Sequence, residues 1–107
     1  MHETEFNAVA DVVLAELEEA LAASDLFDYE VKPGGVLELA FDDGSRIVVN
    51  RHGAAREIWV AARSGGFHFA LRGGQWVDTR SGEELFAALS RLASEQAGEQ
   101  VSLRRRG

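Results

Sequence analysis

Carboxylates are the side chains of this sequence best placed to do chemistry, and they are concentrated near its start. Residues 1 to 31 contain nine acidic residues and no basic one. On an exposed surface such carboxylates attract hard or borderline cations mainly through charge, with modest affinity and little selectivity. The pattern fits either a weak cation site or an acidic surface that only favours solubility. The nine residues are Glu3, Glu5, Asp11, Glu16, Glu18, Glu19, Asp25, Asp28 and Glu30.

The net charge of −7 is unevenly distributed along the 107 residues. Residues 1 to 43 contain twelve acids and one base, Lys32, and therefore carry −11, whereas residues 44 to 107 contain six acids and ten bases and carry +4. This asymmetry favours a cationic partner, metal or protein, for the first part of the chain. It argues against general nucleic-acid binding.

Several kinds of site are excluded by the residues present. The sequence has no cysteine, which rules out disulfides, thiolate metal sites and cysteine-ligated clusters. His2, His52 and His68 do not have the spacing of metal ligands, and we interpret each as an ordinary surface or sheet residue. There is no G-x-S-x-G nucleophile motif, and the Gly65-Gly66 and Gly73-Gly74 pairs are typical of turns rather than phosphate loops. We therefore predict no catalytic residue.

An amphipathic helix must position most of the acidic residues. From Phe6 to about Ser24 the apolar residues recur at helical spacing, with acids on the remaining circumference. Glu18, Glu19 and Asp25 lie near its C-terminal end, where each negative charge costs about 0.3 to 1 kcal/mol against the helix dipole. Residues that oppose folding in this way often mark function.

The middle of the chain has the period of strands, separated by glycine-containing turns. Ser81 followed by Glu84 is typical of a capping box and predicts a second helix, with Gly98 ending it. Helix, strands, helix indicates a single α+β domain over residues 1–107, a two-layer sandwich with both helices on one face of an antiparallel sheet of five to six strands. The predicted strands are 28–32, 36–41, 46–51, 57–62, 66–71 and 75–78.

Neither a signal peptide nor a stretch of about 20 apolar residues is present, so we expect a cytoplasmic protein. The strand alternation also predicts which side chains leave the core. If Ile58 and Phe69 face the helices, Trp59 points outward, either as part of a protein-contact patch or covered by an edge loop. The other side chains predicted to point outward are Val48, Asn50, Ala61, His68 and Ala70.

The segment from Ile47 to Leu89, IVVNRHGAAREIWVAARSGGFHFALRGGQWVDTRSGEELFAAL, resembles the bacterial, CyaY-type branch of the frataxin family, and the similarity extends over nearly the whole chain. The opening EFNAVAD and the closing QAGEQVS are similar to that branch as well. The most specific parts of the resemblance are Asn50-Arg51, Ile58-Trp59, Gly65-Gly66 with Phe67-His68-Phe69, Trp76 and Arg80-Ser81-Gly82-Glu83.

The resemblance implies an iron-binding protein that regulates iron–sulfur cluster assembly. It implies weak, reversible binding of ferrous and ferric iron by an acidic ridge, and docking of Glu18 and Glu19 on a cysteine desulfurase, with the iron–sulfur scaffold protein as a further partner. It also implies an exposed sheet patch of Asn50, Arg51 and Trp59 that binds partners. We expect a monomer, or oligomers driven by iron. By position, the ridge residues are Asp11, Glu18, Glu19, Asp25, Asp28 and Glu30.

The chain departs from this branch at Ala22 and Ala23, where close relatives continue the acidic run, so we expect a reduced iron capacity. Two alternatives remain. One is a ferroxidase or iron-storage-like enzyme, disfavoured because no Glu-x-x-His motif of ferritin-like sites occurs. The other is a protein-interaction module whose iron affinity is incidental. The effect on cluster assembly, activating or inhibitory, and the true ligands are not fixed by the sequence.

Overall fold

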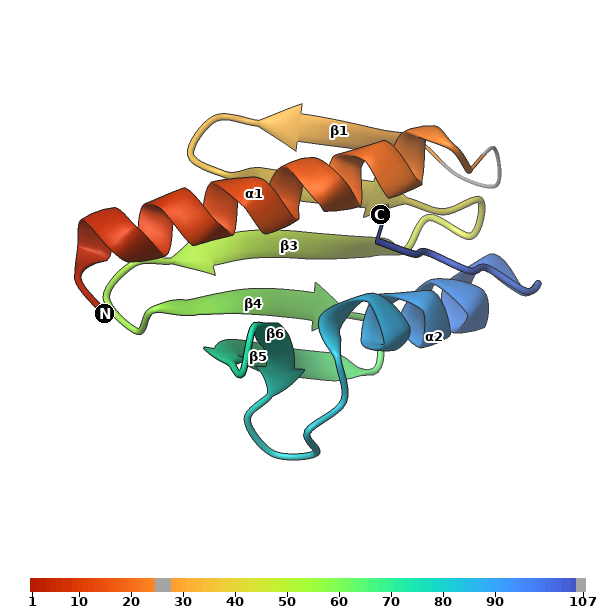
Figure 1. Ribbon diagram of the computed structural model, residues 1–107. Coiled ribbons are helices and arrows are strands. Elements are labelled where there is room, and N and C mark those ends of the chain that lie inside the picture. The colour runs from red at the N-terminus through yellow and green to blue at the C-terminus, as the bar shows by residue number, and fades with distance from the viewer. Residues whose placement is uncertain (25–27, 106–107) are drawn as a thin grey trace.

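The computed structural model describes residues 1–24 and 28–105 of the chain. In these residues a long helix is followed by six strands and a second helix (Figure 1). The helices are α1 (Glu3–Ala22) and α2 (Leu85–Ala97). The strands are β1 (Asp28–Lys32), β2 (Val36–Ala40), β3 (Arg46–His52), β4 (Glu57–Ala62), β5 (Gly65–Arg72) and β6 (Gln75–Asp78).

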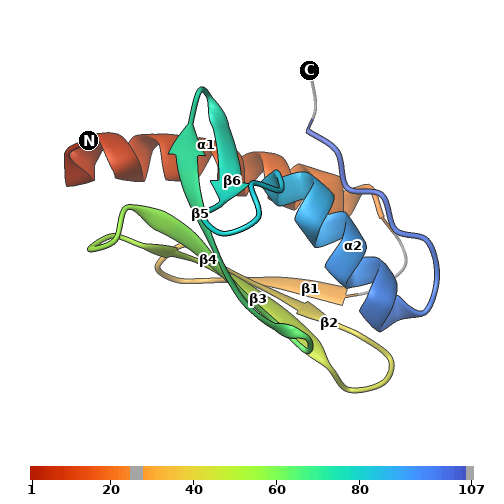
Figure 2. The ribbon, with the colours of Figure 1, turned by 90° about the horizontal axis from the view of Figure 1, so that it is seen from below.

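The six strands form one antiparallel sheet in chain order, each paired with its neighbour in the sequence. Both helices lie on the same side of this sheet, and β5 and β6 curve towards them (Figure 2). No helix among the described residues covers the other side, which we call the outer face. The predicted two-layer α+β sandwich is therefore confirmed, with six strands.

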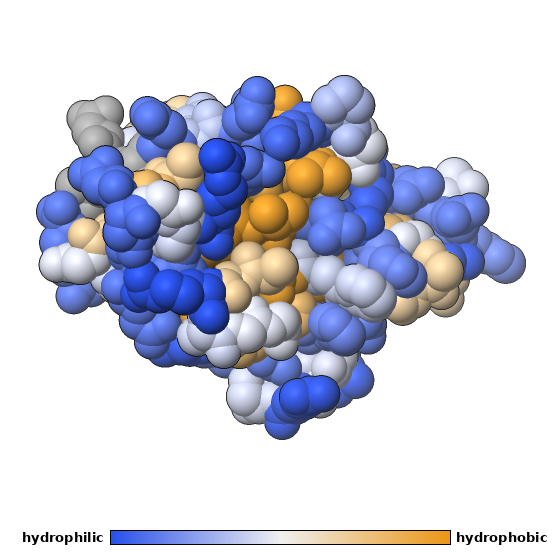
Figure 3. Space-filling model, turned by 180° about the vertical axis from the view of Figure 1, so that it is seen from behind, coloured by the Kyte–Doolittle hydropathy of each residue, from blue (hydrophilic) through white to orange (hydrophobic). Residues whose placement is uncertain are grey.

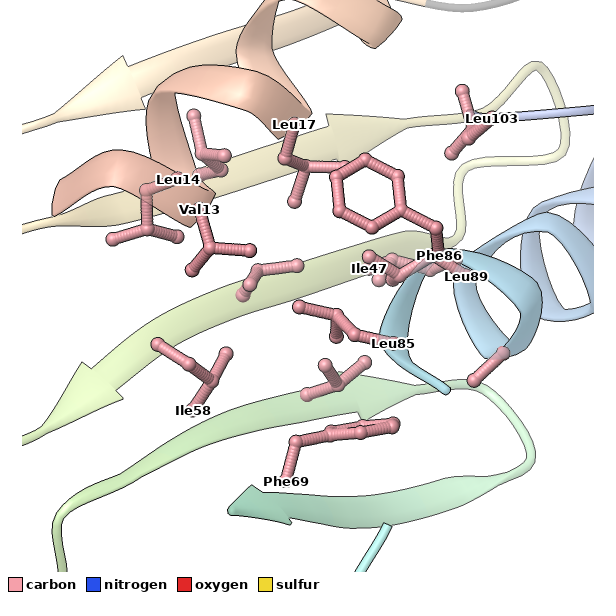
Figure 4. Close-up of a cluster of buried hydrophobic side chains, with 14 of the residues drawn as sticks. Val13, Leu14, Leu17, Ile47, Ile58, Phe69, Leu85, Phe86, Leu89 and Leu103 are labelled. Atoms are coloured by element: carbon pink, nitrogen blue, oxygen red, sulfur yellow. The ribbon is translucent and has the colours of Figure 1, made fainter. Parts of the chain in front are cut away.

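The core fills the space between the helices and the inner face of the sheet. Helix α1 contributes a stripe that includes Phe6, Val13 and Leu17, all at most 3% exposed. Inward side chains from alternate strand positions meet this stripe and the apolar side of α2 (Figure 4). They include Ile58 and Phe69, as predicted, and also Ile47. The alternation leaves every second strand residue on the outer face.

Glu84, rather than Ser81, is the N-cap of α2, so the predicted capping box is wrong. The Glu84 carboxylate accepts hydrogen bonds from the backbone N–H groups of Phe86 at 2.8 Å and Ala87 at 3.2 Å. The Ser81 hydroxyl lies before the helix and accepts from Glu83 N–H instead. The predicted end of α2 is confirmed, because Gly98 has the left-handed φ of 73° that suits glycine.

After α2 the chain runs back along that helix towards α1. The backbone N–H groups of Val101 and Leu103 donate to the Ser94 and Ser90 hydroxyls, at 2.9 and 2.8 Å. Both apolar side chains are buried. Neither helix in the described part of the chain is long and apolar enough to cross a membrane.

Candidate functional site

Three of the predicted ridge residues, Asp11, Glu18 and Glu19, are exposed on α1. Asp11 and Glu18 are seven residues apart, which is almost two helical turns, so they lie on the same side of the helix. That side is left in solvent because the buried stripe faces the sheet. We call Asp11, Glu18 and Glu19 the acidic face of α1.

Asp28 and Glu30 lie elsewhere, on the edge strand β1. In register they oppose Ala40 and Glu38 of β2, which alternate with the buried Leu37 and Leu39. Opposed residues point to the same side of a sheet, so both acids are on the outer face, separate from the acidic face of α1. The predicted ridge is thus divided between two layers, and its sixth member, Asp25, lies outside the described residues.

The negative charges of Glu30 and Glu38, at the β1 edge of the outer face, are partly neutralised by Lys32. Lys32 Nζ lies 2.8 Å from Glu38 Oε2 and 4.0 Å from Glu30 Oε2. The hydrogen bond from Lys32 holds the pKa of Glu38 below its ordinary value, and the same bond raises the pKa of Lys32. Within residues 1–24 and 28–105 no three His, Asp or Glu side chains are grouped so that they could hold an ion together. Cations are therefore offered open carboxylates rather than a closed cage.

Arg51 does not share a surface with Asn50 and Trp59, so its predicted place in the sheet patch is wrong. It opposes the buried Ile58 in the β3–β4 register, on the side of the helices. Its Nη2 lies 2.5 Å from Asp11 Oδ1 on α1. Adjacent residues of a strand point to opposite faces, which separates Arg51 from Asn50.

Trp59 stands on the outer face, half-buried between two histidines. Its ring is parallel to those of His52 and His68 within 10°, with centroids 3.7 and 4.4 Å away. Trp59 Nε1 donates a 2.9 Å hydrogen bond to Glu57 Oε1, and Asn50 is its neighbour across β3 and β4. The indole is therefore held rigidly, with both faces covered and its edge accessible.

The stacking of His52 and His68 on Trp59 was not expected from the sequence, in which both histidines resemble ordinary surface or sheet residues. The antiparallel register accounts for the stack. His68 of β5 directly opposes Trp59 of β4, and His52 of β3 is two residues after Asn50, which opposes Trp59 from the other neighbouring strand. Two rings parallel to one indole at these distances lie on its opposite faces. His52 and His68 therefore cannot bind one ion together.

The rest of the outer face is apolar in its middle and polar around it (Figure 3). At the edge of this face the negative charge of Glu38 is balanced by its pairing with Lys32 and Arg46. Apolar side chains gathered beside a held indole are typical of protein-contact surfaces. The apolar residues that the register places on this face include Val36, Ala40, Val48, Ala61 and Ala70.

A helix, a six-strand meander and a second helix, with an acidic first helix and an open sheet face, form the architecture of a frataxin-like domain. Residues 1–99 match the model of the family with that description, and the chain belongs to the frataxin family. It is 56% identical over 105 residues to the iron–sulfur cluster assembly protein CyaY of Dechloromonas aromatica, covering 97% of this chain and all of that protein. The CyaY protein of Cupriavidus metallidurans is 49% identical, with 97% of each chain covered.

Solved structures agree with this assignment. Frataxin from Psychromonas ingrahamii superposes with a TM-score of 0.88 at 29% identity, covering 98% of this chain and all of that one. A ferrous complex of trimeric frataxin from the yeast Saccharomyces cerevisiae gives 0.65 at 28% identity, covering 89% and 87%. The family is thus one of cluster assembly proteins, named for assembly rather than for a catalysed reaction.

Proposed function

We propose that this protein binds iron weakly on its acidic surfaces and regulates iron–sulfur cluster assembly by docking on a cysteine desulfurase. The observation that carries the proposal is the acidic face of α1, where Asp11, Glu18 and Glu19 are exposed opposite the buried stripe. Iron is here a cargo or signal and not a resident cofactor. The frataxin family membership and the ferrous complex of the yeast neighbour support this reading.

The chemistry of the acidic face suits both roles. Fe²⁺ and Fe³⁺ accept carboxylate oxygens, and open carboxylates on a helix give fast and weak exchange. The same field attracts a basic protein surface and raises its rate of association. The carboxylate of Asp28 on β1 would extend the attraction around the edge of the sheet, whereas that of Glu30 lies beside Lys32.

The test is an anaerobic heteronuclear NMR titration of the labelled protein with Fe²⁺, repeated with the cysteine desulfurase. We expect selective loss of Glu18 and Glu19 signals in both titrations. The charge-reversed variant E18K/E19K should weaken both binding events. Its control is E95K/E99K, which makes the same change in net charge at the end of α2.

If E18K/E19K and E95K/E99K reduce desulfurase binding equally, docking depends on net charge and not on the acidic face. If neither ligand perturbs residues of α1, the proposed site is wrong. A ferroxidase role would require a ligand cluster, and none occurs in the described ranges. We therefore expect Fe²⁺ to be oxidised no faster with this protein than with E18K/E19K, as measured by oxygen uptake.

A second contact with the assembly machinery, such as the scaffold protein, is favoured by the rigid Trp59 on the outer face. Trp59→Ala should weaken binding of a partner that uses this face while Fe²⁺ titration of α1 stays unchanged. Partner-induced NMR shifts confined to Asn50, Trp59 and His68, with no response to iron anywhere, would instead favour a plain interaction module.

A further inference from the structure

A groove of about 160 Å³ runs between α1 and the hairpin of β1 and β2. Its floor is apolar and includes Leu14 and Leu37, and Val31 at its side is 52% exposed. Asp11 and Glu18 stand on its α1 rim. An apolar floor with a carboxylate rim suits a side chain that is aliphatic along its stem and cationic at its head.

One such side chain already lies in the groove. Arg51 extends from β3, lies against the β1–β2 turn so closely that a Cβ on Gly35 would overlap its guanidinium, and reaches Asp11 at 2.5 Å. Its side chain is 23% exposed, whereas that of Asp11 is 61% exposed. The chain's own arginine thus shows the geometry in which this groove holds a guanidinium.

Arg51 is the base that neutralises a carboxylate on the rim of this groove, since other nearby bases pair elsewhere. Lys32, the single base among residues 1 to 43, is paired with Glu38 on the outer face and not with α1. Arg105 reaches α1 at Glu16, which does not line this groove. Arg51 therefore neutralises Asp11, one of the two rim carboxylates that an approaching cationic group meets.

We propose that Arg51 is an internal competitor for the groove, which a basic side chain of the docking partner must displace from Asp11. This inference rests on the proposed docking of a cysteine desulfurase through the acidic face. It adds that a partner arginine inserts between α1 and the β1–β2 hairpin, and that Arg51 limits the affinity. An exposed ion pair of this kind changes an equilibrium by a factor of up to about five.

The experiment compares R51Q with R46Q in desulfurase binding by isothermal titration calorimetry. Both variants remove one positive charge from β3, but Arg46 pairs with Glu38 on the outer face, where Lys32 remains a partner of that carboxylate. We expect R51Q to bind about two- to fivefold more tightly than R46Q. In the D11N background the extra gain from R51Q should disappear, because the contested carboxylate is gone.

A purely structural role for the Arg51 pair predicts a different pattern, since R51Q and D11N would then both weaken binding in proportion to their loss of stability. Thermal unfolding of each variant separates the two cases. R51Q and R46Q with equal affinity, or a folded R51Q that binds more weakly than the unmodified protein, would overturn the role of Arg51 alone. Absence of desulfurase binding by the unmodified protein would overturn the docking proposal and this role with it.

Discussion

At Gly35 both the backbone conformation and the nearby Arg51 side chain disfavour any residue that has a Cβ. The φ of Gly35 is +77°, a left-handed value, and a Cβ there would overlap the guanidinium of Arg51. Gly34, its neighbour in the same turn, has a φ of +87° but no atom within 4 Å of an added Cβ. The two positions therefore separate conformational strain from steric overlap.

We predict that G35A destabilises the protein more than G34A does. G34A should cost about 1 to 2 kcal/mol of unfolding free energy for the left-handed conformation alone. G35A should add up to about 1 kcal/mol, because the flexible Arg51 side chain must move and its pairing with Asp11 is weakened. Urea unfolding measures both, and the difference should shrink in an R51A background. Equal costs for G34A and G35A would mean that Arg51 is not held against the turn.

The stack on Trp59 allows a second prediction about single side chains. H52A and H68A should each lower the unfolding free energy by about 0.5 to 1.5 kcal/mol, the usual range for an aromatic pair. In a W59L background both losses should fall towards zero, because the shared partner is absent. Losses that persist in that background would show that the histidines stabilise the sheet without the indole.

At the scale of elements, the N-cap of α2 is Glu84, whereas the sequence predicted Ser81. E84A should cost about 1 kcal/mol of unfolding free energy, because its carboxylate accepts from two otherwise unpaired N–H groups of the first turn. S81A, which removes the hydroxyl of the predicted cap, should cost much less. Chemical unfolding of the two variants decides which residue caps the helix.

The strand pairing at the edge of the sheet gives a pH-dependent prediction. Folding lowers the pKa of Glu38, mainly through the hydrogen bond from Lys32, so folding favours its charged form. Its stabilisation is therefore complete above its ordinary pKa near 4.5 and is lost as the pH falls towards the lowered value.

The unmodified protein should accordingly exceed E38Q in stability at pH 6, and the difference should shrink as the pH falls below about 4.5. Thermal unfolding from pH 6 to pH 3 measures the difference between the two proteins. E99Q, at an exposed position after α2, serves as the control for removing one carboxylate. A difference that stays constant over the whole range would contradict a role for the Glu38 charge.

The sequence was sufficient for the elements because period and turns are local properties. The strands β1, β4 and β6 have the predicted bounds, and the others differ by a residue at their ends. It was insufficient for the site wherever a side chain crosses between elements. Arg51 reaches α1 from β3, and the histidine stack joins three strands, and neither contact follows from spacing along one segment.

For the molecule as a whole, the division of charge matters more than its sum. The −11 of residues 1 to 43 includes the carboxylates of the acidic face of α1, while Glu38 on the outer face is paired with Lys32 and Arg46. A long-range field from one side steers a basic partner to that side before contact. Such steering acts on the association rate and is screened by salt, since the Debye length is about 10 Å at 0.1 M.

Desulfurase binding should therefore show an association rate that falls about tenfold or more between 50 and 500 mM NaCl, with a nearly constant dissociation rate. Stopped-flow kinetics, followed by tryptophan fluorescence, measures both the association rate and the dissociation rate. E18K/E19K should flatten the salt dependence more than E95K/E99K, although both variants have the same net charge, because only the first pair lies on the steering surface. A dissociation rate that carries the whole salt dependence would instead place the ionic contacts within the formed interface, and the acidic face would then act by direct pairing and not by steering.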